Sequence, residues 1–224
     1  MTAKPLADPV RRSPLEAVHE ARGARWRTET ERWPANFGQP DRERKALAQA
    51  AVLVEMGPLD KLLVAGHGTA AVLRAAGLEV APGHVSPARH PGMPEVWGLA
   101  PDEALVLAAD DALAARLIGP GAASARYGSA VTLLWLAGPR APEILQISCP
   151  ADTRLTSLMD LRLLHGPIAN VRVTLARRDL RGTTAYTLAV PRDYAAYLWS
   201  ALLSIGRDLG LVAAGLDVFE GAGA

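Results

Sequence analysis

The sequence predicts an α+β fold made of two βαβ-like lobes with antiparallel sheets. Strand-like and helix-like segments follow one another as strand–helix–strand–helix and then strand–helix–strand–strand–helix. Residues 130–136 (AVTLLWL) are almost continuously apolar, as in a strand that is buried on both faces. Residues 171–175 and 186–190 alternate apolar with polar side chains, and a polar turn over 177–184 joins them. This pattern favours a hairpin over a doubly wound parallel sheet.

The remaining elements follow from periodicity and from capping residues. Asp41 and Asp110 can each cap a helix at its start, whereas Gly77 and Gly210 are placed to end one. Four prolines and two glycines make 81–94 a loop. A further loop is expected over 32–38. Helices are expected over 15–24, 41–54, 69–76, 110–118, 139–145 and 194–209, and strands over 59–64, 104–108, 130–136, 171–175 and 186–190.

Composition limits the classes of function. Half of the 224 residues are hydrophobic, which is enough for a sizeable core, and the net charge of +1 offers no field for nucleic acid or an acidic membrane. Residues 1–14 are expected to be a flexible tail, and 15–224 a domain of two lobes divided near 120–130. The N-terminal segment lacks the apolar core of a signal peptide, and Cys149 is the only cysteine, so we expect a cytoplasmic protein.

Motifs of known chemistry are weak in this chain. Residues 66–71 (GHGTAA) imitate a dinucleotide fingerprint, but the helix is short and Glu79 comes too early, which favours a plain strand-to-helix turn. No metal site is expected, because none of the five histidines has a second ligand at helical spacing. They are His19, His67, His84, His90 and His165. Cys149 has no neighbouring base and is expected to be a partly buried structural thiol.

Several ordered segments resemble the folate-binding domain of glycine-cleavage T proteins (aminomethyltransferases). The family's "LQGPxAxxIL", "VPxxxAxxLW" and "GLxPAGL" patterns are similar to residues 136–145, 190–199 and 210–216. The opening of the family resembles Gly23–Arg25, Trp33–Pro34 and Phe37–Gly38. The resemblance implies two ferredoxin-like lobes with antiparallel sheets, and it runs in short pieces through nearly the whole chain.

A narrower resemblance is to the gamma subunit of heterotetrameric sarcosine oxidase. Residues 97–103 (WGLAPDE) and 149–152 (CPAD) are similar to its "WLGPDEW" and "CPLD" segments, as are 174–177 and 186–199. This resemblance implies a non-catalytic subunit of a flavin-dependent oxidase or dehydrogenase that acts on sarcosine or another N-methyl amine. It also implies flavin and folate sites on larger partner subunits, within a hetero-oligomer linked to one-carbon metabolism.

The chain departs from T proteins where their chemistry lies. Their "GGVIDD" aspartate falls in the loop 82–94, which here contains no acid, and Thr187 stands where their pterin-binding glutamate is expected. A threonine hydroxyl cannot accept two parallel hydrogen bonds from a pterin as a carboxylate does. We therefore expect no catalytic residues, and the resemblance leaves only weak cofactor-binding candidates, Thr187, Tyr186 and Arg177.

Two functions remain open at this stage, with a third behind them. The chain is expected either to be a partner-dependent subunit, or to be a freestanding tetrahydrofolate-dependent aminomethyl or methyl transferase. A folate-binding assembly factor for iron–sulfur enzymes is weaker, because its "KGCYxGQE" segment is absent. Trp26, Trp33 and Trp97 fit a partner interface and a buried core about equally well.

Overall fold

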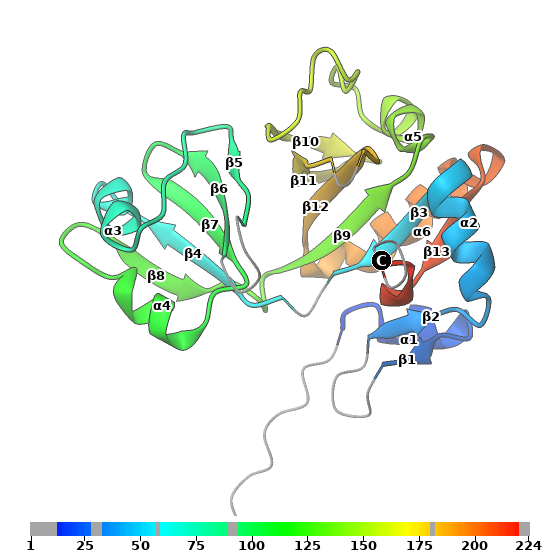
Figure 1. Cartoon of the computed structure of the whole chain (residues 1–224), viewed down its shortest axis with the longest axis horizontal. Helices are drawn as coiled ribbons and strands as arrows, with labels where there is room; N and C mark the ends of the chain where they lie inside the picture. Colours follow the sequence, from blue (N-terminus) through cyan, green and yellow to red (C-terminus); the bar gives the residue numbers. More distant parts are fainter. Residues whose placement is uncertain (1–12, 28–32, 57–58, 89–93, 180–181, 220–224) are drawn as a thin grey trace, which may run out of the picture.

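The computed structural model describes residues 13–27, 33–56, 59–88, 94–179 and 182–219 (Figure 1). These residues form two larger antiparallel-rich sheets of six and five strands, with helices packed on them. A two-stranded ribbon of β1 (Arg25–Trp26) and β2 (Pro34–Asn36) stands beside the larger sheet. The expected α+β class with antiparallel sheets is therefore confirmed. None of the described helices is long and apolar enough to cross a bilayer.

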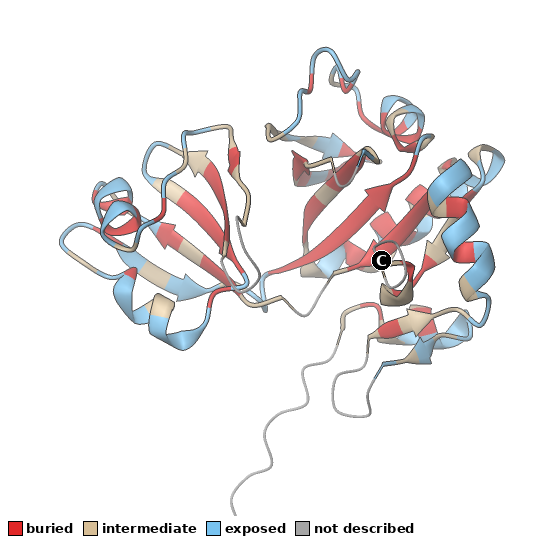
Figure 2. Cartoon of the chain, in the orientation of Figure 1, coloured by how far each residue is buried: buried red, intermediate tan, exposed pale blue. Residues whose placement is uncertain are grey.

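The six-stranded sheet has the order β10-β11-β12-β9-β3-β13, and only the β13–β3 pair is parallel. Helices α5 (Ala141–Ser148) and α6 (Ala195–Ile205) cover one face and share a core with it around Leu136, Ile144 and Trp199. Every residue of the central strand β9 is buried, as its continuous apolar run predicts (Figure 2). The strands are β3 (Ala51–Glu55), β9 (Val131–Ala137), β10 (Leu163–Ile168), β11 (Val171–Arg177), β12 (Ala185–Pro191) and β13 (Leu211–Ala214).

The five-stranded sheet is antiparallel throughout, in the order β5-β6-β7-β4-β8. Helices α3 (Thr69–Ala75) and α4 (Asp111–Arg116) pack on one face over a separate core. Asp110 caps α4 by accepting a 2.7 Å hydrogen bond from Leu113 N, as expected from sequence. The strands are β4 (Lys61–Ala65), β5 (Val85–Ser86), β6 (Glu95–Ala100), β7 (Glu103–Leu107) and β8 (Ala123–Arg126).

The two sheets meet through an apolar cluster and through backbone hydrogen bonds. The cluster is contributed by both sheets and contains Val85, Trp97, Leu105, Leu107, Leu133, Ala176 and Ala189. Val85 N donates to Leu161 O at 2.9 Å, and Leu163 N donates to Gly83 O at 3.0 Å. The face of the six-stranded sheet that is free of α5 and α6 is thus shared. The five-stranded sheet packs on it around Leu133 and Ala189, and α2 (Pro40–Gln49) and η3 (Leu216–Phe219) pack on it around Val54 and Trp135.

Some sequence predictions are wrong in detail. The helix expected over 41–54 ends at Gln49 as α2 (Pro40–Gln49), and the last four expected residues, 51–54, belong to β3 instead. Their β-branched side chains and the complete burial of Ala51–Glu55 between β9 and β13 outweigh the helical spacing. The loop 32–38 contains β2, and the loop 81–94 contains β5.

The helix expected over 194–209 is interrupted. It ends at Ile205, and Leu209 lies in a short 3₁₀ helix, η2 (Arg207–Leu209), which Gly210 ends at φ 77°. The remaining short elements are α1 (Glu16–Ala21) and the 3₁₀ helices η1 (Arg192–Tyr194) and η3 (Leu216–Phe219). The tail expected over 1–14 lies outside the described residues as far as residue 12.

Candidate functional site

Thr187 lies on the face of β12 that looks toward the five-stranded sheet. It is half-buried and stands in register between Trp135 of β9 and Ala176 of β11. Ala189 follows two residues later on the same face, within the cluster that joins the sheets. The surroundings of Thr187 are therefore mainly aromatic and aliphatic.

Tyr186 and Arg177 lie on the opposite face of the six-stranded sheet, where they are directly paired across β12 and β11. Tyr186 is fully buried, and its hydroxyl has no hydrogen-bond partner among the described residues. Burial raises the pKa of Tyr186 to about 12, although nearby Arg177 opposes the shift. The three residues singled out from the sequence thus do not form one site, because Thr187 points to one side of the sheet and the other two point away from it.

Arg177 is held by the protein itself. Its guanidinium donates to Leu155 O at 2.9 Å and to Leu158 O at 2.8 Å, and it pairs with Asp179 at 2.6 Å. The hydrogen bond to Asp179 is the main cause that raises the pKa of Arg177. Arg177 therefore fastens the segment 155–158 to β11 and has few donors left for a ligand.

Glu95 is a buried carboxylate that sequence analysis missed. It directly follows the acid-free loop 82–94 and begins β6. Its Oε1 accepts a 2.7 Å hydrogen bond from Trp97 Nε1, and its Oε2 is 3.0 Å from Arg178 Nε. Burial raises the pKa of Glu95, while Arg178 and the indole oppose the shift. Both oxygens of this carboxylate are already engaged by the chain's own donors.

The signal for Glu95 was present in the sequence. Residues two apart on a strand share a face, so a strand through 95–97 puts the carboxylate beside the indole of Trp97. Trp97 is fully buried, which corrects the interface reading of this side chain and leaves the core reading. Trp26 and Trp33 are half-buried.

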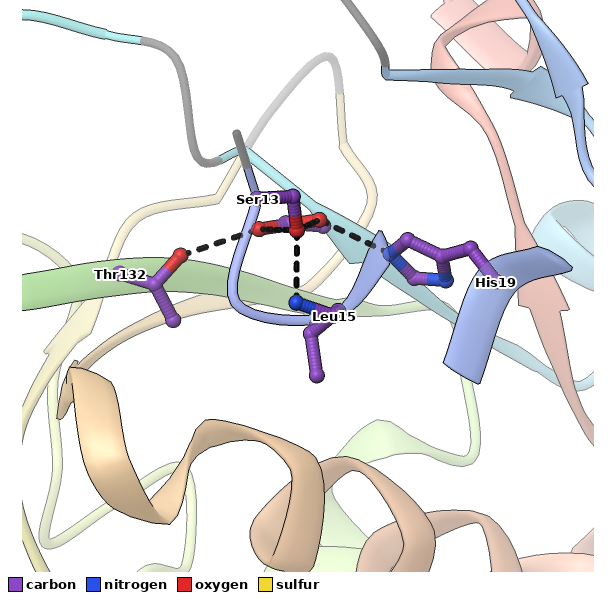
Figure 3. Close-up of polar contacts among 5 residues, drawn as sticks. Ser13, Leu15, His19 and Thr132 are labelled. Atoms are coloured by element: carbon purple, nitrogen blue, oxygen red, sulfur yellow. Dashed lines mark hydrogen bonds and ion pairs between the residues drawn. The ribbon is translucent and has the colours of Figure 1, made fainter. Parts of the chain in front are cut away.

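A second buried carboxylate, Glu55 at the end of β3, organises the polar cluster shown in Figure 3. Ser13 Oγ donates to it at 2.6 Å, His19 Nε2 lies 2.8 Å from its Oε2, and Thr132 Oγ1 donates at 3.2 Å. His19 is fully buried and its ring stands edge-on to Trp199 with centroids 4.9 Å apart. Because Ser13 contacts the carboxylate and not the imidazole, the group is not a nucleophile–base–acid relay. It ties α1 to the six-stranded sheet.

The other sequence motifs have structural roles. A Cβ on Gly66 or on Gly68 would lie 2.2 Å from the carbonyl oxygen of Gly121 or Pro120, respectively, so the loop 120–122 fills the space above this strand-to-helix turn. This close approach requires glycine at both positions, so the two glycines need no bound nucleotide to account for them. Cys149 is buried in the core beside α5, as expected.

The histidines are spread over the fold. His84 contacts Arg162 across the junction of the sheets, His165 Nδ1 lies 3.0 Å from Thr174 Oγ1, and His90 lies outside the described residues. Among the described residues no group of three His, Cys, Asp or Glu side chains is placed to hold a metal ion.

Comparison with known proteins supports the T-protein resemblance. Residues 120–221 match the family model of the GCVT N-terminal domain. An aminomethyltransferase from Streptomyces avermitilis is 29% identical over an alignment of 227 positions, which covers 92% of this chain and 60% of that relative. An aminomethyltransferase from Halothermothrix orenii is 34% identical over 84 residues, or 38% of this chain and 23% of the relative. The chain thus spans about 60% of the length of the longer-matching relative.

Solved structures share the fold. Glycine cleavage system aminomethyltransferase T from Bartonella henselae superposes with a TM-score of 0.74 at 19% identity, covering 94% of this chain and 61% of that one. A chain of heterotetrameric sarcosine oxidase from Corynebacterium sp. U-96 superposes with a TM-score of 0.67 at 23% identity, covering 91% of this chain and 98% of that one. The resemblance to T proteins is confirmed, and the likeness to a chain of heterotetrameric sarcosine oxidase is one of fold.

Proposed function

We propose that this chain is a non-catalytic, sarcosine-oxidase-gamma-like subunit of a flavin-dependent oxidase or dehydrogenase acting on sarcosine or another N-methyl amine. Larger partner subunits hold the flavin and the folate in this proposal, and the chain contributes interface area to their cytoplasmic assembly. The fold shared with nearly the whole of a chain from a heterotetrameric sarcosine oxidase supports it.

The observation that carries the proposal is that the polar groups between the sheets have little hydrogen-bonding capacity left for a pterin. Thr187, which stands where T proteins are expected to have their pterin-binding glutamate, can offer one hydroxyl beside Trp135 and Ala176. Glu95, the buried carboxylate nearest in sequence to the acid-free loop, already accepts from Trp97 and Arg178. A pterin would have to displace these partners. The buried carboxylate of Glu95 would then lose the interactions that offset the free-energy cost of its burial.

Reconstitution tests the subunit role. The chain is co-expressed with candidate flavoprotein subunits from its own organism, and sarcosine oxidation is measured on the purified assembly. We expect a stable assembly with unchanged turnover in Thr187→Val and in Thr187→Ala, because no reacting group of the proposal lies there. Flavoprotein subunits that assemble and turn over normally without this chain would contradict it.

A freestanding tetrahydrofolate-dependent aminomethyl or methyl transferase is the second candidate. The 29% identity with an aminomethyltransferase over 92% of this chain favours it. The chain alone would then transfer a methyl or aminomethyl group to tetrahydrofolate, and Thr187→Val would lower the rate. An inactive chain that supports sarcosine oxidation only within the assembly excludes this candidate.

A further inference from the structure

The outward side of α6 separates two hollows on the surface of the six-stranded-sheet lobe. Tyr197, Ser200 and Ser204 are exposed along this side, while Leu198, Trp199 and Leu202 point into the core. Ser204 lines both hollows, so the two are contiguous. α6 and one hollow lie on the face of the sheet opposite to the five-stranded sheet, whereas the other hollow lies at the edge strand β13, between α6 and α2.

The first hollow lies between α5 and α6 and has a volume of about 450 Å³. Its lining contains no charged residue and includes Ile147, Pro150, Pro167, Tyr197 and Ile205. Ile147 is 65% exposed and Tyr197 is 53% exposed, which is unusual for side chains of this size. Large apolar and aromatic side chains in a hollow whose lining has no charged residue are typical of the core of a protein interface.

The second hollow, of about 330 Å³, is basic at its rim. Arg22 follows α1, Arg42 belongs to α2 and Arg207 begins η2, so three separate elements bring one guanidinium each. The floor is formed by side chains that include Phe37, Leu203 and Leu211. Three like charges on one hollow favour an anionic occupant.

Glu43 is the one acidic residue in the lining of the basic hollow, and its carboxylate is held by backbone donors and not by the arginines. It is buried, and its Oε1 accepts a 2.6 Å hydrogen bond from Phe37 N while its Oε2 accepts a 3.0 Å hydrogen bond from Gly215 N. Arg42 donates to the neutral side chain of Gln39 at 3.1 Å. Among the described residues no carboxylate forms an ion pair with Arg22, Arg42 or Arg207, so this rim is open to carboxylates of another molecule.

We propose that the α6 docking surface, defined as Ile147, Tyr197 and Ser204 with Arg22, Arg42 and Arg207, binds a segment of a partner subunit. The segment carries an aliphatic or aromatic anchor for the uncharged hollow, next to acidic side chains for the arginine rim. Bidentate arginine–carboxylate pairs fix its register, and the anchor excludes water from the centre. The proposal rests on the subunit role and names the chemistry of the partner.

Charge argues against a second copy of this chain as the occupant. A twofold dimer uses the same patch on both copies, so it brings the two arginine rims into one interface. Like charges that face each other across an interface weaken association. An acidic partner instead forms a favourable ion pair with each arginine of the rim.

The test compares surface variants with matched controls in the reconstituted assembly with flavoprotein subunits. Ile147→Asp and Arg207→Glu alter the α6 docking surface, while Ile118→Asp, at a side chain 61% exposed, and Arg116→Glu alter the other lobe. We expect the first two to weaken association at least tenfold in Kd and the two controls to change it less than threefold. Ser204→Cys carries a fluorophore whose emission is expected to shift on assembly, since the native Cys149 is buried.

The outcomes separate the two proposals. Flavoprotein subunits that do not bind the wild-type chain overturn the subunit role itself. Subunits that bind Ile147→Asp and Arg207→Glu as tightly as wild type overturn the α6 docking surface and leave the subunit role standing. A homodimer that sedimentation detects and that Ile147→Asp disperses overturns the choice of an acidic partner.

Discussion

Replacement of Glu55 by leucine tests how strongly the buried polar cluster stabilises the fold. The substitution keeps a bulky side chain at this buried position of the sheet but removes the acceptor shared by Ser13, His19 and Thr132. His19 and Thr132 are 0% and 2% exposed, so their donors cannot turn to water, whereas half-buried Ser13 can. Each of these two buried donors left without an acceptor costs about 1–3 kcal/mol. Because the buried pair of His19 and Glu55 is also lost, we expect the free energy of unfolding to fall by about 3–5 kcal/mol.

Urea unfolding followed by tryptophan fluorescence measures the loss as a lower midpoint at unchanged m-value. Thr132→Val, which removes only the 3.2 Å hydrogen bond, is expected to cost about 1 kcal/mol. The matched control is Glu143→Leu, because that carboxylate pairs with Arg140 on the exposed surface of α5, and its loss is expected to stay within about 1 kcal/mol. Glu55→Leu within 1 kcal/mol of wild type would refute the assignment of a stabilising cluster.

Three other variants have defined outcomes. Burial raises the pKa of Glu95, so the folded chain binds that proton more tightly than the unfolded chain, and the stability from this group falls as pH rises from about 4.5 through the raised value. Glu95→Gln keeps an acceptor for Trp97 and flattens that fall in a pH series of Tm. Tyr186→Phe is expected to be neutral or stabilising by about 1 kcal/mol in urea unfolding, because it removes a buried hydroxyl that has no partner in the part of the chain that the structure describes. Gly215→Ala places a Cβ 2.2 Å from Ala35 O and is expected to lower the unfolding free energy by about 2 kcal/mol or more.

Each of these variants has an informative control or a contrary result. Gly128→Ala meets nothing within 4 Å and should leave the midpoint nearly unchanged. A Tm difference between Glu95→Gln and wild type that does not vary between about pH 4 and pH 7 would contradict the raised pKa. A loss of more than about 1 kcal/mol in Tyr186→Phe would show that the hydroxyl has a partner in solution.

Local sequence patterns predict correctly those helices and strands whose local preference agrees with their packing in the fold. The apolar run of β9, the alternation in β11 and β12 and the cap at Asp110 were all read correctly. The segment 50–54 was read as a helix because alanine and leucine fit helical spacing, whereas pairing with β9 and β13 decides its structure. Short strands such as β5 and β13 form through long-range partners and carry little local signal.

The candidate site was predicted only in outline. The resemblance singled out Thr187, which the structure places beside the junction of the sheets, but sequence alone could not tell which face each neighbouring side chain takes. Period-2 alternation separates Thr187 from Tyr186 once the strand is known. Trp97 lies on the same strand as Glu95, but Arg178 and the partners of Glu55 come from distant parts of the sequence, at separations that no local pattern reports.

Calorimetric titration of the isolated chain with tetrahydrofolate tests the central claim most directly. The engaged carboxylate of Glu95 and the single hydroxyl of Thr187 lead us to expect no saturable binding tighter than about 1 mM, or about −4 kcal/mol. Binding in the micromolar range that Thr187→Val weakens would contradict the subunit role and favour a folate-dependent transferase.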